Sequence, residues 1–400
     1  MKIVFLIGSP AISGGTYVIL QHALYLKRKG HDVSIVTVYT YTKDDLKWHN
    51  AYQVLPIYFK DELQKEAEFD LVIATWWLTA EQIHILSAKC YVYFVQSIES
   101  RFYPEHELAL RQRVDRTYQL GLPVITEATW IANYLKEKYG VSCFLARNGI
   151  RKDIYTEQGE RFENNSRLRV LIEGPLGVPF KNVEQTIKIV RRSKVDSVWL
   201  LTSSQVQNVD GVDRVFSRQP ISEVAKIYRS CDVLVKLSYV EGLFGPPLEM
   251  FHCGGTAIVY EVTGYDEYIV NGYNAISVPV DKESLVVHAL NNLLEDRSEL
   301  NRLKQGARST AEKWIDWEEA SKVFAEGLYV SMRQASNPSR TYLKEKNSES
   351  FRIFLSQSKE KDSVVSLSPK TLSILFHIYQ RLPQPLRAIA KRFKPLFIKG

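Results

Sequence analysis

The sequence is poor in cysteine and contains no long apolar run. Its 400 residues include four cysteines, none of them in a Cys-x-x-Cys pair, which favours buried thiols in a reducing compartment over a disulfide framework or a zinc site. No stretch approaches the roughly 18 apolar residues that a membrane-spanning helix needs. The short apolar run over residues 1–8 leads into a Gly-rich loop without a small-residue cleavage site, which favours a first strand over a signal peptide. We therefore expect a cytoplasmic protein.

An excess of basic charge is absent from most of the chain. The formal net charge is +7, and residues 363–400 alone carry seven basic residues and no Asp or Glu. Residues 1–362 are therefore balanced, so we expect no nucleic-acid partner. In the tail, Lys and Arg alternate with Leu, Ile and Phe, which is typical of a segment that binds an anionic membrane, here its inner face. Three prolines within residues 371–400 also allow a tail that is disordered or packed on a domain.

The sequence does contain a regular alternation of apolar strands and amphipathic helices. Ile3–Ile7 is continuously apolar, as a strand buried on both faces requires, and a helical stretch from Thr16 ends near Gly30. The same alternation begins again at Leu168–Ile172. This pattern predicts an α/β fold with two Rossmann-like domains of parallel strands, which face each other across a cleft. Ligands of such sheets bind outside the carboxyl ends of the strands.

The length of the chain also favours two domains, because 400 residues exceed what one core usually serves. A polar segment with Asn164-Asn165-Ser166 suggests the linker between them. We predict an N-terminal domain over residues 1–155 and a C-terminal domain over 165–315. A helix over 316–332 is expected to pack back on the N-terminal domain, and residues 333–400 to form a flexible connector and the basic tail.

The most informative segment is Glu-Gly-Leu-Phe-Gly-Pro-Pro-Leu-Glu, from Glu241 to Glu249, here named the acidic loop. Its glycines let the backbone approach a ligand closely, and its Pro-Pro pair suits the first turn of a helix. The amides at a helix start bind anions or sugar hydroxyls, and a carboxylate can accept from two neighbouring hydroxyls, such as those of a ribose. Two glutamates eight residues apart would alone indicate a solvated surface; the strand–loop–helix context favours a binding site.

The acidic loop resembles the Glu-x7-Glu motif of the retaining glycosyltransferases of family 4, which have the GT-B fold. The resemblance covers roughly residues 1–330 and includes Gly14-Gly15, Gly30-His31-Asp32-Val33, Arg147-Asn148-Gly149-Ile150 and Cys253-Gly254-Gly255. It implies that the N-terminal domain holds the acceptor and the C-terminal domain a nucleoside-diphosphate sugar, which is the substrate, with no further cofactor.

The resemblance also assigns roles within the acidic loop. Glu249 would bind the nucleotide ribose and Glu241 would lie near the donor sugar. The amides from Leu243 to Gly245 would contact the sugar hydroxyls, so the implied donor-binding residues are Gly14, Gly15, Leu243, Phe244, Gly245 and Glu249.

A narrower resemblance, to bacterial polysaccharide rhamnosyltransferases, rests on Phe69–Trp77, on Tyr93–Gln96 with Glu99, and on Gly264–Tyr268. It implies transfer of a hexose, with L-rhamnose as one candidate, to a cell-surface or lipid-linked glycan.

Two departures from the family pattern concern the charged residues. Family members carry an arginine and a lysine six residues apart that neutralise the diphosphate; Lys181 matches the lysine, but Pro175 stands at the arginine position. Lys236 is a candidate for the missing charge, although a lysine inside an apolar strand can equally pair with a buried carboxylate. Lys181 itself can be read as a surface lysine at a helix start.

The second departure lies in the first domain, where Thr75-Trp76-Trp77 replaces the family's histidine. The two tryptophans can line the cleft or belong to the core. Glu99 follows an apolar strand, which suggests either a catalytic role, beside Glu241, Lys181 and Lys236, or a role in orienting the aromatic loop Phe102-Tyr103-Pro104.

No Asp-x-Asp motif occurs, so we expect a metal-independent enzyme without metal ligands. Two alternatives stay open: a sugar-nucleotide epimerase of the same fold, and a non-catalytic homologue that binds nucleotide or glycan. The presence of Pro175 in place of the arginine supports the second.

Overall fold

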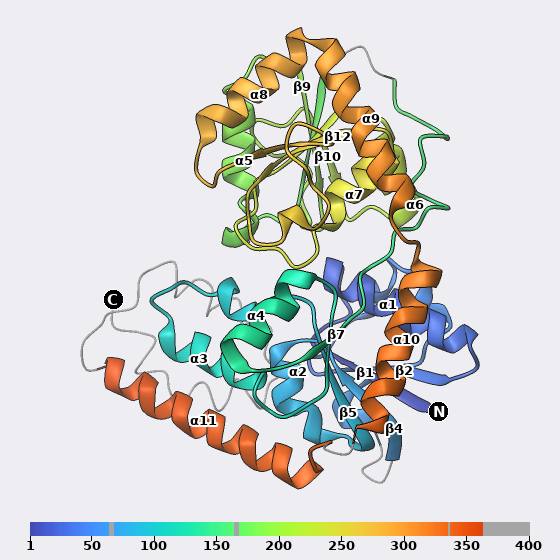
Figure 1. Ribbon diagram of the computed structural model, residues 1–400, viewed down its shortest axis with the longest axis vertical. Coiled ribbons are helices and arrows are strands. Elements are labelled where there is room, and N and C mark those ends of the chain that lie inside the picture. Colours follow the sequence, from blue (N-terminus) through green and yellow to red (C-terminus); the bar gives the residue numbers. More distant parts are fainter. Residues whose placement is uncertain (64–67, 164–167, 335–336, 363–400) are drawn as a thin grey trace.

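The computed structural model describes residues 1–63, 68–163, 168–334 and 337–362 (Figure 1). Two α/β bodies, one above the other in Figure 1, are each built on a parallel sheet. The predicted pair of Rossmann-like domains is therefore confirmed.

The N-terminal domain is a doubly wound sheet of order β3-β2-β1-β4-β5-β6-β7, in which every pair is parallel. Its interior strand β1 is buried on both faces, because helices cover each side. The strands are β1 (Lys2–Ile7), β2 (Asp32–Thr37), β3 (Ile57–Phe59), β4 (Glu68–Ala74), β5 (Ser87–Val95), β6 (Val124–Thr126) and β7 (Cys143–Leu145). The helices are α1 (Gly14–Arg28), α2 (Trp77–Gln82), α3 (Leu108–Thr117) and α4 (Thr129–Tyr139).

Helix α1 shows how local sequence sets these boundaries. The Ser13 hydroxyl caps its start by accepting the Thr16 amide at 3.0 Å. Past its end, Gly30 takes a left-handed conformation with φ of 86°, and the His31 amide donates to the Leu26 carbonyl at 3.1 Å. A glycine adopts this conformation without the steric cost that a Cβ brings.

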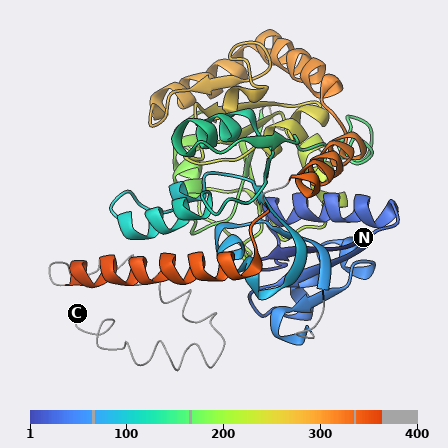
Figure 2. The ribbon, with the colours of Figure 1, turned by 60° about the horizontal axis from the view of Figure 1, so that its bottom comes forward.

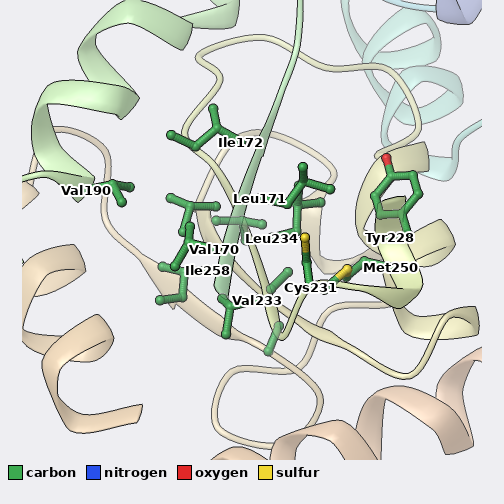
Figure 3. Packing of buried hydrophobic residues seen from close by; sticks show 14 of the residues in the cluster. Val170, Leu171, Ile172, Val190, Tyr228, Cys231, Val233, Leu234, Met250 and Ile258 are labelled. Atoms are coloured by element: carbon green, nitrogen blue, oxygen red, sulfur yellow. The ribbon is translucent and has the colours of Figure 1, made fainter. Parts of the chain in front are cut away.

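The C-terminal domain repeats the same architecture with a sheet of order β10-β9-β8-β11-β12-β13. Figure 3 shows part of its core, where Val170 and Leu171 of β8 lie beside Val233 and Leu234 of β11. The strands are β8 (Arg169–Glu173), β9 (Ser197–Thr202), β10 (Arg214–Ser217), β11 (Val233–Lys236), β12 (Thr256–Tyr260) and β13 (Ile276–Val278). The helices are α5 (Val183–Val190), α6 (Ile221–Arg229), α7 (Gly245–His252), α8 (Glu283–Glu295) and α9 (Arg297–Lys313).

Two segments join the domains in the described part of the chain, and they run in contact with each other (Figure 1). The Ile150 amide donates to the Ile315 carbonyl at 3.1 Å. A Cβ on Gly149 would lie 2.3 Å from the Asp316 carbonyl oxygen, so only glycine fits there.

After the second crossing, helix α10 (Trp317–Arg333) packs on the N-terminal domain. His22 of α1 is stacked on Phe324, with ring centroids 4.0 Å apart, and its Nδ1 lies 3.0 Å from the Ser321 hydroxyl.

The prediction of a flexible connector from residue 333 is wrong for residues 340–362, which form helix α11 (Arg340–Asp362) along the N-terminal domain (Figure 2). Leu343 is buried in the core beneath it, and Ser350 accepts a hydrogen bond from Arg116 of α3 at 3.1 Å. The Arg113 guanidinium lies over the Phe351 and Phe354 rings. The face of α11 that contacts the N-terminal domain has few apolar residues, and Ser and Lys lie between them in the sequence.

The basic tail over residues 363–400 lies outside the described residues. Among the residues that are described, no helix combines the length and apolar character needed to cross a membrane.

Candidate functional site

The acidic loop joins β11 to α7 at the carboxyl end of the C-terminal sheet. Phe244 is the N-cap of α7, and the helix begins at Gly245 with prolines in its first turn. The Gly245 amide donates to the Leu243 carbonyl at 2.9 Å, and the Tyr268 hydroxyl donates to the Phe244 carbonyl. The loop therefore has a defined conformation, which presents Glu241 at its start and Glu249 on the helix.

Glu241 lies between two lysines. Its Oε2 accepts from Lys181 Nζ at 2.8 Å, and its Oε1 lies 3.7 Å from Lys236 Nζ. Burial disfavours the carboxylate, but the two ammonium groups outweigh burial and lower the pKa of Glu241. Oε1 is buried and has no hydrogen-bond partner among the described residues, so its contact with Lys236 is electrostatic.

Lys236 is a buried cation at the end of β11, only 3% exposed. Its Nζ contacts Glu173 Oε2 at 2.6 Å. Burial disfavours the ammonium, but the carboxylates of Glu173 and Glu241 together raise the pKa of Lys236, so it stays charged. Lys236 therefore pairs with a carboxylate, that of the partly exposed Glu173, and also lies close to the buried Glu241.

Pro175, which stands at the arginine position of the family pattern, lies in the turn after β8. Gly174, with φ of 144°, precedes Pro175, and a Cβ placed on Gly174 would lie 4.0 Å from Lys236 Nζ and from Lys181 Cβ. Both lysines therefore lie beside the turn that contains Pro175. Pro175 supplies no charge at that turn. Lys236 brings a positive charge close to it from the neighbouring strand β11.

Glu249 lies on α7 and is half-buried. Burial, reinforced by the charge of Glu173, raises its pKa to about 7, against hydrogen bonds from the Tyr228 and Tyr155 hydroxyls. Since Glu173 also pairs with Lys236, Glu249 and Glu241 belong to one electrostatic cluster. The structure thus brings together Lys181, Lys236 and both glutamates of the loop.

Glu99 lies elsewhere, in the interior of the N-terminal domain just after β5. Its Oε2 accepts the Trp77 amide at 2.6 Å and the Tyr93 hydroxyl at 3.3 Å. Burial raises its pKa to about 8. These contacts fix the start of α2, and Trp77 in turn donates to the Tyr103 hydroxyl at 3.1 Å. The geometry favours the orienting role over the catalytic one.

Gly14 and Gly15 open α1 on the opposite side of the domain junction. A Cβ on Gly15 would lie 3.3 Å from Gln96 Oε1, whereas Gly14 has no neighbour within 4 Å. The Gln96 carbonyl oxygen in turn lies 2.0 Å from a Cβ placed on Gly242. The loop before α1 is therefore close to the acidic loop through Gln96. Burial, and after it the charge of Glu249, raises the pKa of Tyr17 on α1.

Sequence reasoning missed the residues of the N-terminal domain that hold the acidic loop. The Trp130 indole donates to the Gly242 carbonyl at 3.0 Å, and Glu127 accepts the Leu243 amide at 3.0 Å. Glu127 directly follows β6, at the sheet edge where functional side chains collect. That position was the available signal.

Part of the chain matches a known family. Residues 202–310, which include the whole acidic loop, match the family model described as "Glycosyl transferases group 1". An uncharacterized glycosyltransferase of Methanocaldococcus jannaschii is 23% identical over 181 residues, which cover 42% of this chain and 50% of that protein. A D-inositol 3-phosphate glycosyltransferase of Streptomyces bingchenggensis is 32% identical over 111 residues, 28% of this chain and 24% of that protein. The chain therefore spans half of the first relative and about a quarter of the second.

Similarity to solved structures extends over both domains. The Anabaena protein HepE, solved in complex with UDP-glucose, has a TM-score of 0.67 and 15% sequence identity, covering 82% of this chain and 100% of that one. Identity at this level establishes the fold alone. That fold is the predicted GT-B arrangement of two Rossmann-like domains.

Proposed function

We propose that this protein transfers a hexosyl group from a nucleoside-diphosphate sugar to a glycan acceptor. The observation that carries the proposal is Glu241, an ionised buried carboxylate held between Lys181 and Lys236. It lies within the segment that matches the group 1 glycosyl transferases. The complex of HepE with UDP-glucose supports a nucleotide sugar as donor.

In this proposal the lysines serve the leaving group. As the bond from the anomeric carbon to the diphosphate breaks, negative charge grows on the phosphate oxygens. Fixed cations in a water-poor site stabilise that charge more strongly than water does. Lys181, which is partly exposed, approaches the diphosphate directly, while Lys236 adds positive charge from the strand behind it. The start of α7 offers a further partial positive charge.

Glu241 would accept hydrogen bonds from hydroxyls of the transferred sugar and Glu249 from those of the ribose. Retention of configuration, L-rhamnose as the sugar and a lipid-linked or cell-surface glycan as the acceptor are proposed on the resemblance described above. Metal independence is proposed on the absence of an Asp-x-Asp motif from the sequence. We further propose that the protein is cytoplasmic and that the basic segment 363–400 attaches it to the inner membrane face.

A panel of UDP-, dTDP- and GDP-sugars in thermal-shift and transfer assays tests the proposal. A ligand at one hundred times its Kd stabilises the native protein by about 2.7 kcal/mol, so the donor is expected to raise the melting temperature by several degrees. Glu241→Gln should abolish transfer. Glu295→Gln, at an exposed glutamate of the same domain, is the matched control.

Several outcomes would contradict the proposal. Conversion of the donor to its epimer without an acceptor would establish an epimerase. Full transfer activity in Glu241→Gln would show that Glu241 is not needed for transfer and that the proposed site is wrong. Nucleotide binding without transfer, in the presence of acceptor glycans, would show that the protein is a non-catalytic homologue that binds nucleotide. Deletion of residues 363–400 that leaves the protein bound to vesicles containing anionic lipid would exclude the tail as membrane anchor.

A further inference from the structure

Glu127 is a buried carboxylate that links the two domains. It follows β6 of the N-terminal sheet and is 4% exposed. Its Oε1 accepts the amide of Leu243, in the acidic loop of the other domain, at 3.0 Å. A Cβ on the adjacent Gly242 would lie 2.7 Å from the same oxygen. The loop therefore approaches Glu127 as closely as a glycine backbone allows.

The second oxygen of Glu127 reaches the connection between the domains. Glu127 Oε2 accepts from Asn148 Nδ2 at 2.8 Å, and Asn148 precedes the tight contact at Gly149. Trp314, just before the second crossing, donates its indole hydrogen to the Asn148 carbonyl at 2.9 Å. One carboxylate thus ties the acidic loop, directly and through Asn148, to both segments that join the domains, here named the hinge.

The hydrogen bonds of the loop show what this tie determines. The Leu243 amide is taken by Glu127 and the Gly245 amide by the Leu243 carbonyl. Within the described ranges, no acceptor contacts the Phe244 amide. Of the amides from Leu243 to Gly245, that of Phe244 is without an acceptor among the described residues, and its position depends on where Leu243 is held.

We propose that Glu127 is a positioning residue that holds the acidic loop in its ligand-binding conformation and couples it to the hinge. This role rests on the proposed function only in naming the ligand, a nucleoside-diphosphate sugar. The coupling acts in both directions, since a ligand that fixes the loop also stabilises the contact between the domains. Glu127 itself need not touch the substrate.

Two substitutions distinguish the loss of the side chain with its hydrogen bonds from the loss of its charge alone. Glu127→Ala removes both acceptors and leaves the buried Leu243 amide unpaired. Glu127→Gln can keep both bonds, because the Asn148 Oδ1 is buried without a partner among the described residues. Rotation of the Asn148 amide lets that oxygen accept from the new side chain. Glu137→Ala, at an exposed glutamate of α4, is the matched control.

Hydrogen–deuterium exchange of the Leu243–Gly245 amides gives a readout independent of catalysis. The free-energy cost of leaving a buried amide without a hydrogen bond is enough to weaken the contact between the acidic loop and the N-terminal domain about tenfold. We therefore expect Glu127→Ala to speed exchange of the Leu243 amide about tenfold, and to raise the KM for the donor and the Kd for UDP by a similar factor at nearly unchanged kcat. Glu127→Gln and Glu137→Ala should match the wild type.

Two kinds of result, in the exchange measurement and in the kinetics, would overturn the assignment. Unchanged exchange in Glu127→Ala, or Glu127→Gln behaving as Glu127→Ala, would exclude these hydrogen bonds as the cause. A fall in kcat at unchanged KM, together with a lower melting temperature, would show a merely structural role. If the wild type binds no nucleotide sugar but the exchange results hold, the proposed function fails and the positioning role stands.

Discussion

Glu99 makes the stability of the N-terminal domain depend on pH in a direction opposite to that of most carboxylates. Burial raises its pKa from 4.5 to about 8. A carboxyl with a higher pKa in the native than in the unfolded protein stabilises the fold fully below the unfolded value. That stabilisation is lost as the pH rises from 4.5 to about 8, because the native protein must ionise a group buried away from water.

The size of the effect follows from the two pKa values. Each pKa unit between native and unfolded protein corresponds to about 1.36 kcal/mol, so the loss between pH 5 and pH 9 is on the order of 4 kcal/mol. For a domain of this size, that free energy corresponds to a change of about 10 °C in melting temperature. Glu99→Gln removes this loss, and its amide oxygen can still accept from both the Trp77 amide and the Tyr93 hydroxyl, which donate to the same oxygen of Glu99.

The assay is thermal unfolding of wild type and Glu99→Gln from pH 5 to pH 9, followed by tryptophan fluorescence. Raised carboxyl pKa values elsewhere, at Glu127 and Glu249, are common to both proteins and cancel in the difference. The substituted protein should gain stability relative to wild type as the pH rises, while Glu137→Gln, at an exposed site, should follow wild type. Parallel curves for wild type and Glu99→Gln would refute the reasoning.

Three further predictions concern the buried charge of Lys236, the contact between the domains at Gly242 and the packing of α11. Lys236→Met leaves Glu173 without its partner, so the unfolding free energy should fall by about 3–5 kcal/mol in a denaturant titration; an unchanged value would show that the charge is not buried as described. Gly242→Ala places a Cβ against backbone of the other domain and should weaken UDP binding at least about tenfold in calorimetry, with circular dichroism unchanged. Leu343→Ala should cost about 2–4 kcal/mol and Leu355→Ala, at an exposed position, almost nothing; equal effects would mean that α11 does not pack.

Much of the architecture could be predicted from the sequence, because buried parallel strands have a strong local signal. The expected strand Ile3–Ile7 is observed as Lys2–Ile7, and the expected strand Leu168–Ile172 as Arg169–Glu173. The short edge strands Ile57–Phe59 and Arg214–Ser217 were not expected. Edge strands are only partly buried, so their sequences lack a continuous apolar run.

Contacts between distant parts of the chain account for what was missed at the site. Glu127 and Leu243 are 116 residues apart, and nothing near either one indicates that they meet. The partner of Lys236 was foreseen as a carboxylate, but its identity as Glu173 depends on the pairing of β8 with β11. Helix α11 was overlooked because its buried face is sparse and its remaining residues resemble a linker.

The return of the chain through α10 has a consequence for biosynthesis. The C-terminal domain is continuous in sequence, so it can fold as soon as its last helix leaves the ribosome. The N-terminal domain is translated first, yet its core includes Phe324 and Leu328. It therefore stays incomplete, with the face of His22 uncovered, until the C-terminal domain has been synthesised. In contrast to the usual order of synthesis, the domain made second is expected to finish folding first.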